Sequence, residues 1–301
     1  MIICCGEALI DMLPRETPAG EAAFAPYAGG AVFNTAIALG RLGAPVQFFC
    51  GLSSDLFGEQ LRSVLSDSQV DSSPSHISDR PTTLAFVRLT NGHASYAFYD
   101  ENTAGRMLTP ADLPTVTADA LFFGGISLVV EPCGEAYKAL MLREAPAKLT
   151  MIDPNIRPGF ITDAAAYRAR LNAMLAVADI VKISDEDLQW LTGDTDGASL
   201  LDTAATQVVL LTRGADGVTV ITRRGRFDVA AERAEVVDTV GAGDTFNAGF
   251  LAGLDQAGLL TKAGVAQATD DQLRTAAALG AKAAAITVAR AGANPPWAHE
   301  L

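Results

Sequence analysis

Residues 238–250 read DTVGAGDTFNAGF, and they carry the strongest structural signal in this chain of 301 residues. Glycines at 241 and 243 permit a tight turn and let a ligand approach the backbone closely. Small and apolar residues then recur at helical spacing, so the turn is predicted to open a helix. The free amides of its first turn, from Ala242, Gly243 and Asp244, have the positive helix end behind them. They form an anion site suited to phosphate.

Asp244 stands at the edge of this predicted anion site. A carboxylate there can take a proton from an attacking hydroxyl while the amides hold the charge of a transferring phosphoryl group. The alternative is that Asp244 only caps a helix after a glycine turn, and a bare G-x-G-D motif would favour that alternative. A second motif changes the balance.

The second motif, AGGAVFNTA at residues 28–36, places two glycines directly before another predicted helix. Bare backbone at Gly29 and Gly30 lets a ligand lie against the chain, and Asn34 offers both a donor and an acceptor to sugar hydroxyls. A glycine-rich helix entry with Asn34 near the cap is an equally good interpretation of this motif alone.

With both motifs in view, the chain resembles the ribokinase-like (PfkB) family of carbohydrate kinases. The resemblance runs in the family's order from GEALIDM at residues 6–12 to TVARAGA at residues 287–293. The most similar members are bacterial fructokinases and 2-keto-3-deoxygluconate kinases, which share GEALID, AFV, FY and N-x-R-P. The resemblance implies phosphoryl transfer from ATP to a sugar hydroxyl, with Asp244 as the base and Gly241–Gly243 as the anion hole.

Further positions take roles from the same resemblance. Asp11 is expected at the end of the first strand, where ligands gather in parallel sheets. Asn155 and Arg157 follow another strand in DPNIRP and resemble family positions near the phosphates. Phe86 and Phe98 form either an apolar wall against the sugar or a hairpin core. The candidate residues are, for catalysis, Asp244, Gly241, Ala242 and Gly243; for the sugar, Asp11, Gly29, Gly30, Asn34, Phe86, Phe98 and Arg157; and for the nucleotide, Asn155, Lys182, Ser184, Thr212, Gly214 and Gly217.

Metal ions are implied by the resemblance as well. The segment KISDED at residues 182–187 stands where many members carry N-x-x-E, associated with magnesium and phosphate, so Asp187 is the candidate metal ligand. An equally good interpretation is that Ser184 caps a helix with acids in its first turn. We expect ATP and Mg²⁺ as cofactors. A monovalent cation such as K⁺ is a further expectation near Asp238 and Thr239.

Outward from these motifs, apolar runs alternate with helical patterns, which favours a parallel sheet covered on both faces. We therefore predict one ribokinase-like α/β domain, residues 1–301, with three αβα layers and a mainly parallel central sheet. The expected strands are Ile2–Cys5, Val46–Cys50, Ala120–Phe123, Leu149–Ile152, Ile180–Ile183 and Val208–Thr212, with helical patterns at Asn34–Leu42, Leu56–Leu65 and after Ser184.

Two segments break that alternation. Residues 12–28 lack helical spacing, and residues 82–99 alternate apolar and polar around Asn91-Gly92, a strong hairpin signal. We predict a small β lid formed by approximately residues 12–30 and 82–106, which either closes over the site or pairs with a second subunit as a homodimer.

Composition excludes several classes of protein. The net charge is -13 without a clustered basic run, which disfavours binding to nucleic acid or to an anionic membrane. The four cysteines form no C-x-x-C pair, and the first residues look like a strand rather than a signal peptide, so we expect a cytoplasmic protein. Neither a P-loop nor a G-x-S-x-G motif is present, and no G-x-G-x-x-G follows the first strand.

The substrate is predicted from the acids that follow Phe98-Tyr99. Asp100 replaces an Arg that, in the related ketodeoxygluconate kinases, helps to bind the substrate carboxylate, and Glu101 follows it. Two acids repel a bound carboxylate, whereas hydroxyl groups find acceptors there. We therefore expect a neutral hexose, with fructose first. The alternatives are 2-keto-3-deoxygluconate, with Arg106 or Arg157 as its partner, another sugar of the family, or a catalytically silent sugar or nucleotide sensor.

Overall fold

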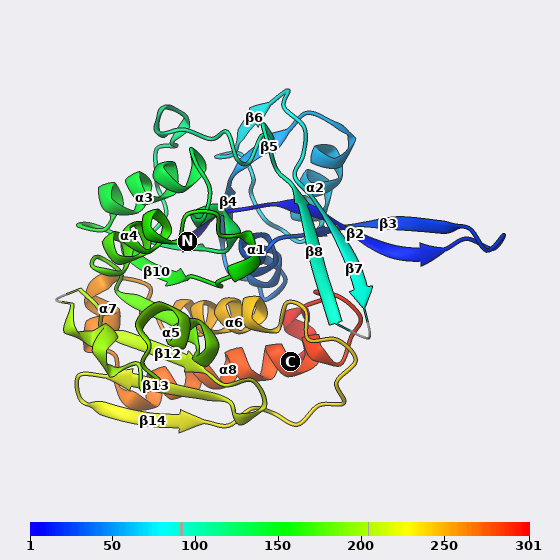
Figure 1. Cartoon of the computed structure of the whole chain (residues 1–301). Coiled ribbons are helices and arrows are strands. Elements are labelled where there is room, and N and C mark those ends of the chain that lie inside the picture. Colours follow the sequence, from blue (N-terminus) through cyan, green and yellow to red (C-terminus); the bar gives the residue numbers. More distant parts are fainter. Residues whose placement is uncertain (91–92, 204) are drawn as a thin grey trace.

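The computed structural model describes residues 1–90, 93–203 and 205–301, and its centre is an eight-stranded sheet (Figure 1). The strand order is β14-β13-β12-β11-β10-β9-β1-β4, and the strands from β12 to β4 in this order are parallel. The last two along the chain, β13 and β14, are antiparallel. The bounds are β1 Ile2–Cys5, β4 Val46–Phe49, β9 Ala120–Gly124, β10 Leu149–Asp153, β11 Ile180–Ser184, β12 Val208–Thr212, β13 Val218–Thr222 and β14 Gly225–Val229.

Helices cover both faces of this sheet. Neighbouring residues of β1 point to opposite faces, so Cys4 joins one hydrophobic cluster and Cys5 joins the other. The cluster that contains Cys4 also takes in residues of α1, α2, α6, α7 and α8, and the cluster that contains Cys5 takes in residues of α3, α4 and α5. The bounds are α1 Ala31–Arg41, α2 Leu56–Asp67, α3 Cys133–Glu144, α4 Ala164–Leu175, α5 Asp185–Thr192, α6 Ala242–Gln256, α7 Lys262–Gln267 and α8 Asp270–Val288.

The predicted three-layer αβα architecture is confirmed. Each of the expected central strands is present, with ends within one residue of the prediction. The first helix begins at Ala31 rather than at Asn34. Gly30 is its cap residue, so the glycine-rich helix entry is present, and Asn34 lies one turn inside the helix. The short 3-10 helices are η1 Pro110–Asp112, η2 Ile126–Leu128, η3 Pro158–Phe160, η4 Ala198–Asp202, η5 Gly214–Asp216 and η6 Ala298–Glu300.

A second sheet leaves the body of the molecule. Its order is β3-β2-β7-β8, and a further pair, β5 (Gly51–Ser53) with β6 (His76–Ser78), lies apart from it. Figure 1 shows β2 and β3 extending as a two-stranded arm. The expected strands within residues 12–28 and 82–99 are present, whereas the predicted turn at Asn91-Gly92 lies outside the described residues. The bounds are β2 Leu9–Glu16, β3 Ala22–Gly29, β7 Leu84–Thr90 and β8 His93–Tyr99.

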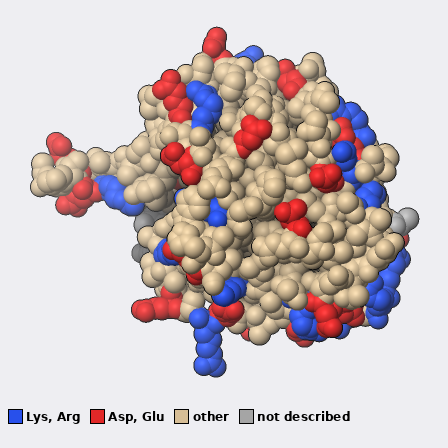
Figure 2. All heavy atoms as spheres, turned by 180° about the vertical axis from the view of Figure 1, so that it is seen from behind, with Lys and Arg blue, Asp and Glu red and all other residues tan. Residues whose placement is uncertain are grey.

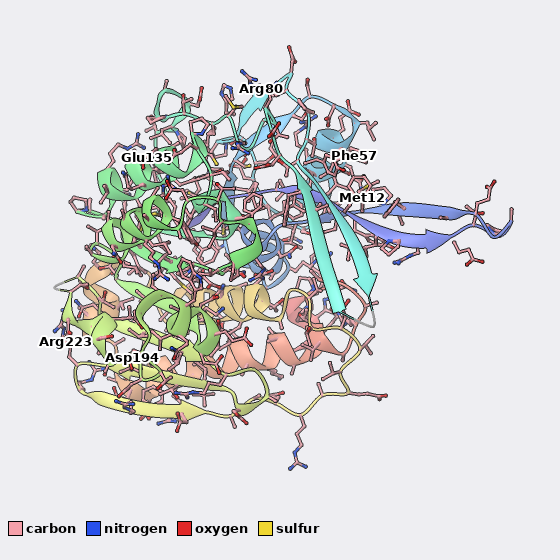
Figure 3. All side chains as sticks on the ribbon, viewed as in Figure 1. Met12, Phe57, Arg80, Glu135, Asp194 and Arg223 are labelled. Carbon is pink, nitrogen blue, oxygen red and sulfur yellow. The ribbon has the colours of Figure 1, made fainter. Side chains whose placement is uncertain are left out.

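The base of the arm is anchored on the body. Met12 of β2 and Phe57 of α2, both labelled in Figure 3, pack against the core cluster that contains Cys4. One end of the second sheet is therefore packed on the body, and the other end projects from it.

The surface agrees with the acidic composition. On the face shown in Figure 2, acidic and basic side chains are interspersed and no broad basic area appears. Among the described residues, no helix combines the length and the apolar content that crossing a bilayer requires.

Candidate active site

A cavity of about 490 Å³ opens at the carboxyl ends of the parallel strands, beneath the second sheet. Residues that directly follow or end β9, β10, β11 and β12 line it, which is the usual position of ligand sites in α/β sheets. The predicted site residues that line it are Asp11, Gly30, Asn34, Phe98, Asn155, Arg157, Lys182, Ser184, Asp187, Thr212, Gly241, Gly243 and Asp244.

Two of the helices whose N-terminal turns line this cavity begin after a glycine with a positive φ. Gly30 precedes α1 with φ 110°, and Gly241 precedes α6 with φ 79°. A Cβ on Gly30 would lie 2.8 Å from the carbonyl oxygen of Glu7, and one on Gly241 would lie 2.6 Å from Cβ of Ala293. Both positions therefore require glycine for conformation and for space.

Asp244 is held by amides from two distant segments. Asn34 of α1 donates from Nδ2 to Oδ2 of Asp244 at 2.9 Å, and Asn155, which follows β10, donates to Oδ1 at 3.4 Å. Both of these hydrogen bonds come from side chains outside α6, so the carboxylate does more than cap this helix. The geometry presents a buried carboxylate to the cavity.

Burial raises the pKa of Asp244 to about 7, against an ordinary carboxyl value of 3.8. The hydrogen bond from Asn34 lowers this pKa, the negative charge of Asp153 raises it, and the positive charges of Lys182 and Arg157 lower it. A carboxylate that titrates near neutral pH suits proton abstraction from a hydroxyl.

The anion site is smaller than the sequence predicts. The amide of Ala242 donates to the carbonyl of Thr239 at 3.3 Å, and Ala242 does not line the cavity. The expectation of a free amide at this position is therefore wrong. Gly243 and Asp244 in the same first turn do line it, where helix amides have no intrahelical acceptor.

The helix-cap interpretation of the Ser184–Asp187 segment is confirmed, and Asp187 also lies at the cavity. Ser184 caps α5 by accepting from the amide of Asp187 at 3.0 Å. The carboxyl group of Asp187 also lines the cavity, where burial raises its pKa to about 6. Within residues 1–90, 93–203 and 205–301, no group of three or more His, Cys, Asp or Glu side chains is arranged to hold a metal ion by itself. Any cation here would need oxygen atoms from a bound phosphate as well.

Asp11 lies in the second sheet, in β2, and not at the end of the first strand as expected. It is paired with Tyr27 of β3 and Ala85 of β7, and burial raises its pKa to about 6. The cavity nevertheless includes it, because this face of the second sheet covers the strand ends.

The wall of Phe86 and Phe98 is not formed. Phe98 is opposite Ala85 and Phe86 is opposite Ala97, so the two rings lie on opposite faces of the sheet. Phe98 lines the cavity and packs on Phe160 with ring centroids 4.7 Å apart. Phe86 packs outside it, as described below.

Three predicted glycines do not line the cavity. A Cβ on Gly29 would lie 2.2 Å from Oδ2 of Asp11, so this glycine makes room for Asp11. Gly214 and Gly217 form the turn between β12 and β13, and a Cβ on Gly217 would lie 2.3 Å from the carbonyl of Val229. Thr212 at the end of β12 lines the cavity without them.

Sequence reasoning missed Glu7. Its carboxylate accepts from the first amide of α1, that of Ala31, at 2.8 Å and from the amide of Ser127 at 3.2 Å. Burial raises its pKa. A carboxyl group just after the end of a buried strand is the signal that the sequence offers. The other lining residues outside the prediction are Leu9, Ala31, Gly125, Ile126, Ile156, Glu186, Thr239 and Val240.

Known proteins match this chain in sequence and in overall fold. Residues 1–300 match the pfkB family carbohydrate kinase profile. A fructokinase of Rhizobium leguminosarum bv. trifolii is 57% identical over 280 residues, which cover 91% of this chain and 86% of that protein.

Two solved structures share the fold along nearly the whole chain. A Xylella fastidiosa fructokinase with bound ATP has a TM-score of 0.89 and 30% identity, covering 97% of this chain and 93% of that one. A Vibrio cholerae O395 fructokinase with fructose, ADP and calcium has a TM-score of 0.84 and 26% identity, covering 97% and 94%. The expected family is confirmed: the chain belongs to the pfkB family of carbohydrate kinases.

Proposed function

We propose that this ATP-dependent carbohydrate kinase transfers the γ-phosphoryl group of ATP to a hydroxyl of fructose. The observation that carries the mechanism is the position of Asp244, a buried carboxylate held by Asn34 and Asn155 at the N-terminus of α6. The fructokinases to which the chain is similar support fructose as the substrate.

The sugar would lie between the second sheet and α1. Asp11, Asn34 and the bare backbone at Gly30 offer hydrogen-bonding groups to its hydroxyls on this side of the cavity. Asp244 would take the proton of the attacking hydroxyl as the oxygen bonds to phosphorus and the bond to ADP breaks. The amides of the first turn of α6 would hold the charge of the phosphoryl oxygens.

The nucleotide would lie toward β11 and β12, where Lys182, Ser184 and Thr212 line the cavity together with Asn155 and Arg157. Magnesium suits this side, because Asp187 and Glu186 supply carboxylates and Mg²⁺ usually binds one or two carboxylates plus substrate phosphates. Bound with ATP, magnesium would neutralise phosphate charge.

A monovalent cation such as K⁺ would lie near the loop that leads into α6. Asp238 shapes this loop by accepting from the amides of Val240 at 3.0 Å and Gly292 at 2.9 Å. Thr239 lines the cavity beside it.

Asp100 and Glu101 do not line the main cavity, so the predicted repulsion of a substrate carboxylate by these acids is not what favours a neutral sugar. The argument for a neutral sugar is instead the pairing of Asp100 with Arg106. Asp100 is nearly buried, and Nη1 of Arg106 donates to both of its carboxylate oxygens at 3.1 Å. This pair lines a small chamber that shares Glu7 and Ile126 with the main cavity. Because Asp100 already neutralises Arg106, a substrate carboxylate gains little there.

The second sheet would serve as a lid and as a dimer contact. Its outer face carries Phe86 with Phe24 and Tyr99 at ring-centroid distances of 5.0 and 5.4 Å. Phe24 is 48% exposed and Tyr99 is 63% exposed, which is unusual for large apolar rings unless a partner covers them. A second copy of this chain is the partner we propose. A cytoplasmic location fits the four cysteines, which are buried free thiols.

The test is an assay of ADP release with ATP and a panel of sugars that includes fructose and 2-keto-3-deoxygluconate. We expect fructose to give the highest kcat/KM and the product to be a fructose phosphate. Asp244→Asn should lower kcat by about 10²–10⁴ while both ligands still bind, because it removes the base and keeps the side-chain shape. A clear preference for the acid, or an Asp244→Asn variant with normal kcat, would contradict the proposal.

A further inference from the structure

A buried ion pair lies at the wall of the active site, with Lys182 lining the cavity and Asp153 behind it. Asp153 ends β10 and Lys182 belongs to β11, and Nζ of Lys182 donates to Oδ2 of Asp153 at 2.9 Å. The exposed fractions of the two side chains are only 2% and 6%. Asn247 of α6 donates to the same carboxylate oxygen at 2.7 Å. Three elements therefore meet at one carboxylate.

Stability alone does not account for this pair. Removing two charges from water costs about as much as their attraction returns, and well-packed apolar side chains often serve as well. The other oxygens of the group, Oδ1 of Asp153 and Oδ1 of Asn247, are buried without a hydrogen-bond partner. Buried acceptors without a protein partner are uncommon, so the pair calls for an explanation beyond stability.

The ammonium group lies against the first turn of α6. A Cβ on Gly243 would be 3.2 Å from Nζ of Lys182, and Lys182 lines the cavity together with Gly243 and Asp244. An ammonium group has three donors, and the bond to Asp153 uses one. Its positive charge therefore adds to that of the helix end, at the place where phosphoryl oxygens would lie.

We propose that Asp153 is a positioning residue that holds the ammonium group of Lys182 against the first turn of α6, where Lys182 donates to the phosphoryl group during transfer. Asn247 fixes Asp153 in turn. Lys182 keeps its protons throughout, since the proton of the sugar hydroxyl goes to Asp244. This inference rests on the proposed phosphoryl transfer at this site.

The same pair acts on Asp244 by charge. After burial, which is the main cause of its raised pKa, the charge of Asp153 raises the pKa of Asp244 and the charges of Lys182 and Arg157 lower it. Neutralising Lys182 should therefore move the acidic limb of the rate profile to higher pH, and neutralising Asp153 should move it to lower pH. The other charged or titratable side chains on the cavity wall are those of Glu7, Asp11, Glu186 and Asp187.

The test compares Lys182→Met, Asp153→Asn and the double variant with the wild-type enzyme. We expect Lys182→Met to lower kcat by about 10², as for loss of a transition-state donor, with the sugar KM changed less than about threefold. Asp153→Asn should lower kcat by about tenfold, with its acidic limb at lower pH. The double variant should be no slower than Lys182→Met, because Asp153 acts through Lys182 and the two losses are not additive.

A matched control lies at the opposite end of β11. Asp179 is also buried and accepts from Nζ of Lys262 at 2.7 Å on both oxygens, but neither residue lines the cavity. Lys262→Met should lower the melting temperature without changing kcat or the acidic limb. Lys262 is 34% exposed and Asp179 is 4% exposed, so this control separates loss of an ion pair to a buried carboxylate from loss of a charge at the site.

Wild-type kcat in Asp153→Asn, or a double variant that loses the product of the two single losses, would overturn the inference. Asp153→Asn leaves the charge of Lys182 unpaired and could fail to fold for that reason. The double variant buries neither charge, so its kcat compared with that of Lys182→Met then tests whether Asp153 acts through Lys182. These outcomes are measured on an enzyme whose wild-type activity is established first. A wild-type protein that phosphorylates no sugar would instead contradict the proposed function.

Discussion

The N-termini of α1 and α6 open into the same cavity after similar glycines, but their electrostatic surroundings are opposite. At α1, Glu7 places a carboxylate on the first amide, that of Ala31. At α6, the first amide is turned to the carbonyl of Thr239. The ammonium of Lys182 lies beside the first turn, which also carries the carboxyl group of Asp244. The comparison shows that a glycine-led helix start does not define an anion site by itself. The neighbouring charge decides whether a neutral sugar or a phosphate suits the helix end.

Most of the other α-helices begin differently. In α2, α4, α5, α7 and α8 the residue before the helix accepts a bond from an amide of the first turn through its own side chain. These caps satisfy first-turn amides that would otherwise be free to donate to a ligand. The glycine-led helices leave that role to a distant carboxylate in α1 and to the proposed phosphate in α6.

The largest effect on this comparison is expected from Gly241→Ala. A Cβ there would lie 2.6 Å from Cβ of Ala293, and the residue would have to adopt a φ of 79°, which side chains disfavour. The turn before α6 must therefore shift. A displacement of about 1 Å near the chemistry can cost about 10² in rate, and we expect a loss of that order in kcat.

The matched control for this variant is Gly258→Ala, just beyond the C-terminal end of α6. Gly258 also has a positive φ, 67°, but a Cβ there meets nothing within 4 Å. We expect unchanged kcat and a loss of about 1 kcal/mol in the free energy of unfolding, measured by urea denaturation. Equal loss of activity in both glycine variants would show that the α6 turn has no special role.

A smaller effect is expected from Asn34→Ala and Asp11→Ala, which sharpen the assignment of the α1 side to the sugar. Loss of one or two hydrogen bonds should weaken sugar binding by about tenfold or more and leave ATP binding within about threefold. Calorimetric titration of each ligand measures both. Equal losses for the two ligands would assign these residues to a shared site or to folding.

Glu7→Gln tests the α1 end directly, and its main effect should be on stability. The two buried amides of Ala31 and Ser127 share one carboxylate, and a Gln side chain can accept from only one of them with its oxygen. We expect the variant to lose about 1–3 kcal/mol in the free energy of unfolding, the cost of one unsatisfied buried group. An unchanged unfolding curve would contradict the assigned role of Glu7.

The smallest effect is expected at an ordinary helix cap. Thr269 accepts from the amide of Gln272 at 3.3 Å at the start of α8, away from the cavity. Thr269→Ala should cost about 1 kcal/mol in stability and leave kcat unchanged. A fall in kcat would show that a side-chain-capped helix start away from the cavity also affects catalysis, and would contradict the distinction drawn between capped and glycine-led helix starts.

The sequence predicts one of the two helix ends better than the other. The spacing of Gly241, Gly243 and Asp244 identifies the α6 turn, because the glycine requirement and the helix that follows are local. The bond between Asn34 and Asp244 spans 210 positions of the chain, and no local spacing encodes it. The sequence assigns Asn34 to sugar hydroxyls only, and its bond to Asp244 is a finding of the structure.

Other errors have the same cause. A shared wall of Phe86 and Phe98, one of two interpretations, fails because alternation gives the face of a residue only relative to its own strand. The register between β7 and β8 sets the rest. Glu7 was missed because its partners, Ala31 and Ser127, come from two later segments. The central strands were predicted well, since a sheet buried on both faces produces continuous apolar runs.

The most direct test of the account is the pH dependence of kcat/KM for the sugar at saturating ATP. The pKa of Asp244 is raised by burial to about 7, and only the ionised carboxylate can accept the hydroxyl proton. The account therefore predicts a rate that is level above this pKa and falls about tenfold per pH unit below it, with an inflection near pH 7. A rate that stays level from about pH 5 to pH 8 would contradict the assignment of Asp244 as the base.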